Sequence, residues 1–150
     1  MKKIFIILLI LLCFGCGKIQ SPITLEEFQD SCDKNELYFY DISDNFKDSQ
    51  KVIQAGMAST SVWHIEFYIF NEEDDAIEAY ESNKQNFLDV KKESTTFTDS
   101  DKSYNNKVTY SLTTNTTYYY ISRIDETMIF VQVPVEYRGR VKKFHESLGY

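Results

Sequence analysis

Glycine, proline and histidine are scarce in this sequence, which has five glycines, two prolines and two histidines in 150 residues. The glycines form no phosphate-binding loop, and no Gly-x-Ser-x-Gly segment is present to expose a serine nucleophile. Two histidines are too few for a metal site built on imidazole alone. These shortages remove the short motifs that identify most enzymes, so we expect no catalytic activity and no cofactor.

The sequence also lacks an apolar N-terminal run long enough to cross a bilayer. A spanning helix takes about 20 apolar residues, whereas the uncharged run at residues 4–14 has eleven. This run follows Met1-Lys2-Lys3, and about 7–15 apolar residues after a basic start are typical of a signal peptide. Residues 1–15 are therefore predicted to be a signal peptide.

Cys16 follows Gly15 directly at the end of this run. The segment resembles the lipobox of bacterial lipoproteins, with Cys13 and Phe14 where that family usually has leucine and a small residue. The resemblance implies that the Cys16 thiol carries a diacylglyceryl group and that the chain is cut just before it. It also implies a lipid-anchored protein on the extracytoplasmic side of the cell membrane. The alternative is an ordinary cleaved signal peptide followed by an incidental cysteine.

Free thiols and positive charge are both depleted in the exported chain. Cys13 leaves with the signal peptide, so a lipidated Cys16 leaves Cys32 without a disulfide partner in the chain; without lipidation, Cys16 and Cys32 could pair. Loss of Lys2 and Lys3 lowers Lys plus Arg from 16 to 14 against 23 Asp plus Glu, a side-chain charge of −9. This acidity excludes nucleic acid as a partner and opposes lying flat on an anionic membrane.

The rest of the sequence predicts one α+β domain at residues 23–150 on a tether at 16–22. Thr24 and Glu27 form a capping box that begins a helix, and apolar-polar alternation predicts strands. The first half is expected to hold a helix from residue 24, strands at 37–42, 52–58 and 62–70, and a helix over 72–90 that is capped by Asn71. A polar loop at 91–106, strands at 107–113, 117–124 and 127–133, and a helix over 137–148 are expected to follow. Short connections predict an antiparallel sheet with helices packed on it, in the order helix, three strands, helix, three strands, helix.

Two phrases of the sequence, residues 65–70 and 120–125, are similar to a group of small lipoproteins of unknown function from Gram-positive bacteria. The order of the predicted elements is similar as well. The resemblance implies an envelope location and brings no particular activity with it.

His64 and Glu66 lie two residues apart on the solvent-facing side of a predicted strand. A carboxylate beside an imidazole can orient a general base or begin a metal site, whereas the alternative is a solvated ion pair. Asp99 and Asp101 begin a segment spaced like the first half of a calcium loop. Tyrosines stand where that loop requires its glycine and its closing glutamate, which argues against calcium.

Aromatic residues supply the most distinctive surface that the sequence predicts. A two-residue turn at 125–126 would place the strands at 117–124 and 127–133 side by side, with apolar groups on both faces of the sheet. Either helices cover both faces, or one face is an exposed aromatic surface of the kind that binds a protein, a peptide or a glycan. The residues of this candidate binding face are Tyr68, Tyr119, Ile121 and Phe130.

These observations favour a membrane-anchored extracytoplasmic lipoprotein that acts as a non-enzymatic binding or accessory domain, with an envelope protein, peptide or glycan as its partner. One alternative is a weak metal-dependent or hydrolase-like enzyme centred on His64 and Glu66. The other alternative is a structural protein of the cell envelope that has no ligand.

Overall fold

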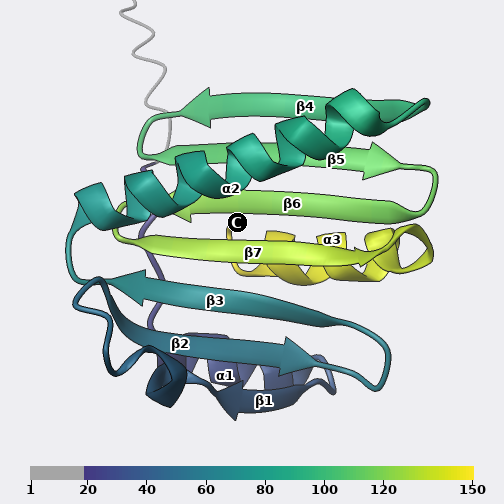
Figure 1. Cartoon of the computed structure of the whole chain (residues 1–150). Helices are drawn as coiled ribbons and strands as arrows, with labels where there is room; N and C mark the ends of the chain where they lie inside the picture. Colours follow the sequence, from purple (N-terminus) through teal and green to yellow (C-terminus); the bar gives the residue numbers. More distant parts are fainter. Residues whose placement is uncertain (1–18) are drawn as a thin grey trace, which may run out of the picture.

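The computed structural model describes residues 19–150 (Figure 1). The predicted signal peptide and Cys16 lie outside these residues. Seven strands form one antiparallel sheet, and three helices pack on it, which confirms the α+β class. Helix α2 crosses one face of the sheet, which we call the α2 face. Helices α1 and α3 lie on the other face, which we call the α1/α3 face (Figure 1). No helix of the described residues is long and apolar enough to span a bilayer.

The elements follow one another with short connections. The helices are α1 (Leu25–Lys34), α2 (Glu73–Glu93) and α3 (Arg138–Ser147), with short 3-10 helices η1 (Ser43–Phe46) and η2 (Val135–Tyr137). The strands are β1 (Tyr38–Asp41), β2 (Val52–Ser59), β3 (His64–Phe70), β4 (Phe97–Tyr104), β5 (Lys107–Thr114), β6 (Thr117–Ile124) and β7 (Thr127–Pro134). Their order in the sheet is β1-β2-β3-β7-β6-β5-β4, so the pairing of β3 with β7 joins the two halves of the chain.

The predicted order of elements is wrong at one place. Residues 91–106 are not a loop, because α2 extends to Glu93 and β4 pairs with β5 along the edge of the sheet. The order is therefore helix, three strands, helix, four strands, helix. The second helix also begins one residue later than predicted, since Glu72 rather than Asn71 is its N-cap.

β4 has a polar sequence on both faces, and its contacts explain why. On the α2 face, its two aspartates accept hydrogen bonds from lysines of α2: Lys84 Nζ lies 2.7 Å from Asp101 Oδ2, and Lys91 Nζ lies 2.7 Å from Asp99 Oδ2. Asp99 and Asp101 are thus held by lysines and do not form a calcium loop. Ion pairs in place of apolar contacts leave no hydrophobic alternation by which the strand could be predicted.

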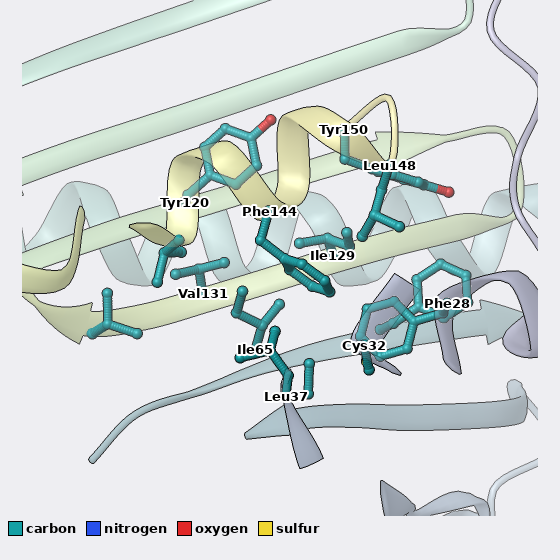
Figure 2. Close-up of a cluster of buried hydrophobic side chains, with 14 of the residues drawn as sticks. Phe28, Cys32, Leu37, Ile65, Tyr120, Ile129, Val131, Phe144, Leu148 and Tyr150 are labelled. Carbon is teal, nitrogen blue, oxygen red and sulfur yellow. The ribbon is translucent and has the colours of Figure 1, made fainter. Parts of the chain in front are cut away.

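α1 packs closely on the α1/α3 face of the sheet. The predicted capping box is confirmed: Glu27 N donates to Thr24 Oγ1 over 3.2 Å, and Thr24 N donates to Glu27 Oε2 over 2.8 Å. The helix points Phe28 and Cys32 into the core, beside the inward residues of β3 and β7 (Figure 2). Burial raises the pKa of the Cys32 thiol to about 12, as expected of an inert cysteine inside a core.

α2 covers a second apolar cluster on the opposite face. The ring of Phe87 lies 5.1 Å from that of Tyr119 and 5.6 Å from that of Phe130, measured between centroids. The two-residue turn at 125–126 is confirmed, because Ile124 pairs directly with Thr127. Both faces of the sheet are therefore apolar at its centre, and helices lie on both.

Candidate functional site

A cleft of about 730 Å³ opens on the α1/α3 face, and we call it the α3 cleft. α3 lies behind β6 and β7 and α1 lies behind β2, so neither helix covers β4 and β5 on this side (Figure 1). The uncovered strands form the floor of the cleft, α3 forms its wall, and Gln20 and Tyr150 contribute to its lining. This volume lies in the range of about 300–1,000 Å³ that small-molecule sites usually occupy.

Hydroxyl groups line the floor of the α3 cleft. Side chains on one face of a sheet recur at every second residue, and the register aligns Ser100 of β4 with Ser111 of β5 and Tyr120 of β6. The next row pairs Lys102 with Thr109. All five line the cleft. The floor therefore offers several donors and acceptors to a polar ligand.

Four cationic side chains and one carboxylate line the cleft: Lys102, Lys107, Arg138, Lys142 and Glu146. The carboxylate of Glu146 lies 3.6 Å from Lys142 Nζ. Lys107 Nζ donates to the carbonyl oxygen of Gly149 over 2.7 Å, and burial lowers the pKa of this lysine. The cleft thus has an excess of positive charge within a chain whose net charge is −7.

Arg138 and Lys102 are the least neutralised of these cations. Among residues 19–150, neither has a carboxylate within ion-pair distance. The guanidinium of Arg138 lies over the ring of Tyr118, with its carbon 5.5 Å from the centroid. Such a contact orients the guanidinium and leaves its N–H groups able to donate to an anion.

His145 lies at the inner end of the cleft, and its imidazole is neutral. Burial lowers its pKa to about 4. Its Nδ1 lies 3.0 Å from the main-chain oxygen of Tyr150, which can only accept, so Nδ1 carries the proton. Its Nε2 then accepts from the Tyr118 hydroxyl at 3.4 Å. Burial also raises the pKa of Tyr118, so this hydroxyl is a poor nucleophile.

The chain enters the domain at the rim of the cleft. Gln20 N donates to Asn106 Oδ1 over 3.3 Å, and Asn106 Nδ2 donates to the carbonyl oxygen of Gln20 over 2.7 Å. Gln20, within the segment predicted as a tether, is thus fixed to the turn between β4 and β5. The side-chain oxygen Oε1 of Gln20 is buried and has no hydrogen-bond donor among the described residues.

The predicted pair of His64 and Glu66 lies on the α2 face, away from the α3 cleft. His64 Nε2 lies 3.4 Å from Glu66 Oε1, and the side chain of His64 is 51% exposed. Glu66 also accepts a hydrogen bond from the hydroxyl of Tyr68. In the described part of the chain, no group of three or more His, Cys, Asp or Glu side chains is placed to hold a metal ion.

The predicted aromatic binding face is partly covered. Ile121 is fully buried under α2, so it cannot contact a partner. Tyr119 and Phe130 are half-buried beside Phe87 of α2, and Tyr68 is half-buried against Phe46 of η1, with ring centroids 5.6 Å apart. Coverage by helices therefore accounts for the centre of this face.

The residues of the α3 cleft were missed by the sequence analysis. One signal was present: residues 138–143 hold two arginines and two lysines, a dense basic segment in an acidic chain. The other lining residues come from distant segments, and each is an ordinary polar residue of a strand. Only the fold brings them together.

The fold and the cleft define a single-sheet α+β domain with a basic cleft on one face. The chain matches no protein-family model, no curated protein and no solved structure.

Proposed function

We propose that this chain is a non-enzymatic binding domain, held on the extracytoplasmic side of the cell membrane through a lipid on Cys16. Its ligand is an anionic group on a hydroxylated carbon skeleton, such as a polyol phosphate, bound in the α3 cleft. The observation that carries this proposal is the excess of cations that line the cleft of an acidic chain.

The local charge decides which ligand enters. At physiological ionic strength the Debye length is about 8 Å. Acidic groups that lie farther than this from the cleft are therefore largely screened from a ligand inside it. A ligand inside the cleft responds mainly to Lys102, Lys107, Arg138 and Lys142. An anion is therefore favoured there despite the net charge of the chain.

The other lining groups favour a ligand that also carries hydroxyls. The floor offers the hydroxyls of Ser100, Thr109 and Ser111. A hydroxyl of the ligand can both donate to and accept from these serine and threonine hydroxyls. Binding rather than catalysis is favoured, because the imidazole and the phenol at the inner end pair with each other and burial raises the pKa of the phenol.

Two arginines of α3 allow a matched test. Arg138 lines the cleft, whereas Arg140 lies over Trp63 at 5.8 Å and does not line it. Calorimetric titration with glycerol phosphate should show binding that glycerol alone does not show. The Arg138→Gln variant should bind at least tenfold more weakly, since a hydrogen bond to a charged group contributes about 1.5–3 kcal/mol. The Arg140→Gln variant should bind like the parent. Equal affinities for all three proteins, or no binding by the parent, would contradict the proposal.

A further inference from the structure

The place where the chain enters the domain bears on the source of the anionic ligand. Gln20 is fixed to Asn106 by two hydrogen bonds and itself lines the α3 cleft. Only three residues lie between Gln20 and Cys16. Four residue steps span at most about 14 Å even when fully extended. The rim of the cleft is thus held within about 14 Å of the lipidated cysteine.

This distance exceeds the depth of the polar region of a bilayer by only about 6–9 Å. The hydrocarbon core is about 30 Å thick and the whole bilayer about 40–45 Å, which leaves about 5–8 Å of polar headgroups on each side. A lipid on Cys16 begins at the boundary of the hydrocarbon core. The rim of the α3 cleft then lies at the headgroups or at most about 6–9 Å above them.

We infer that the α3 cleft binds the anionic headgroup of a phospholipid in the same membrane that holds the anchor. This inference rests on the proposed function and names the source of its ligand. The headgroup phosphate contacts Arg138 and Lys142, and a polyol headgroup such as glycerol contacts the hydroxyls of the floor. The anchor keeps the cleft at a high effective concentration of headgroups and so adds to the affinity that the cleft has by itself.

The acidity of the domain limits this contact to the cleft. Outside the cleft, the acidic surface is repelled by an anionic membrane. One basic cleft near the tether and an acidic surface elsewhere would orient the domain on the bilayer. The short link at Gln20 and the headgroup in the cleft would together set this orientation, with the α2 face left open to the surroundings.

Vesicle binding separates this inference from the proposed function. The test protein is the exported chain with Cys16→Ser, so that no lipid anchor holds it to a vesicle. It should sediment with phosphatidylcholine vesicles that contain phosphatidylglycerol and not with vesicles of phosphatidylcholine alone. Replacing Arg138 and Lys142 by glutamine should weaken this binding about tenfold or more, because the headgroup phosphate loses the charge-assisted hydrogen bonds that these two side chains donate.

The matched control removes the same charge from the same helix outside the cleft. Arg140 and Lys143 do not line the cleft, so their double glutamine variant should sediment like the parent. An equal loss in both double variants would indicate general surface attraction and overturn the inference. If the parent binds soluble glycerol phosphate but ignores phosphatidylglycerol vesicles, the headgroup inference fails and the proposed function stands. If it binds neither, both fail.

Discussion

The imidazole of His145 lies flat against the phenol ring of Tyr120, with centroids 3.9 Å apart and planes 13° apart. The stacked pair joins α3 to β6 at the inner end of the α3 cleft. The histidine also donates to the main-chain oxygen of Tyr150, whose side chain is buried and hydrogen-bonded to Thr127. One neutral side chain thus connects the helix, the sheet and the last residue of the chain.

The neutral state of His145 predicts a loss of stability in mild acid. Its pKa is lowered from 6.5 to about 4 in the folded protein because burial opposes the charged form. As the pH falls, the imidazole in the unfolded chain therefore binds a proton before the imidazole in the folded chain does. Stability is lost as the pH falls from the ordinary pKa of 6.5 toward the folded-state pKa of about 4. Between pH 7.5 and pH 5 the free energy of unfolding should fall by about 2 kcal/mol from this group.

Denaturant titrations at both pH values check this expectation. The His145→Gln variant should be less stable overall and should lose most of the pH dependence in this interval. The His64→Gln variant is the control, because His64 is half exposed on the other face and should keep it. Hydrogen bonds lower the pKa of some aspartates, among them Asp99. These groups therefore lose their contribution to stability only in stronger acid. An unchanged pH dependence in the His145 variant would show that the assignment is wrong.

Adjacent residues at the start of β3 should differ sharply in their effect on stability. Trp63 is 5% exposed and lies in the core of the α1/α3 face, whereas His64 points to solvent. Trp63→Ala should lower the free energy of unfolding by about 3–5 kcal/mol. His64→Gln should change it by no more than about 0.5 kcal/mol. Chemical denaturation measures both, and comparable losses would mean that the register of this strand is misassigned.

Alanine substitutions at two glycines should change the stability of the fold in opposite directions. A Cβ at Gly56 of β2 would lie 2.7 Å from Leu25 Cδ1 of α1 and 2.8 Å from Phe39 Cε2, whereas a Cβ at Gly139 of α3 would have no neighbour within 4 Å. Gly56→Ala should therefore destabilise the fold by about 1–3 kcal/mol through overpacking. Gly139→Ala should stabilise it by about 0.5 kcal/mol, because glycine is disfavoured in helices. A Gly56→Ala protein as stable as the parent would refute the close packing of α1 on β2.

The lipid anchor is tested in cells through Cys16. The Cys16→Ser variant should leave the membrane fraction and lose labelling by a fatty-acid analogue, because the thiol that accepts the lipid is gone. A Cys32→Ser variant serves as the control, since Cys32 is buried and should play no part in anchoring. Continued labelling of the Cys16 variant would exclude this cysteine as the site of the anchor.

Most of the fold could be predicted from hydrophobic periodicity. β6 and β7 carry apolar residues on both faces because helices cover both, and the register across their turn follows from the two residues at 125–126. β4 could not be predicted in this way. It is an edge strand whose side chains meet lysines of α2 on one face and the open cleft on the other, so no apolar pattern arises.

The candidate site was harder to predict for a different reason. The signals that the sequence offers are polar residues close together in the chain, as in His64 and Glu66, and apolar residues of the sheet. The α3 cleft instead combines Gln20, strand residues near 100–111 and the basic face of α3. These segments meet only through the order of strands in the sheet, which places β4 and β5 beside the helix that follows β7.

The most direct test of the account is to locate the bound ligand by NMR. Amide signals of the exported Cys16→Ser chain would be followed during titration with glycerol phosphate. The account predicts shifts concentrated at the α3 cleft, around Lys102, Lys107, Arg138 and Lys142, with little change near Tyr68 on the α2 face. Shifts centred on the α2 face, or no shifts at saturating ligand, would contradict the assignment of the cleft as the binding site.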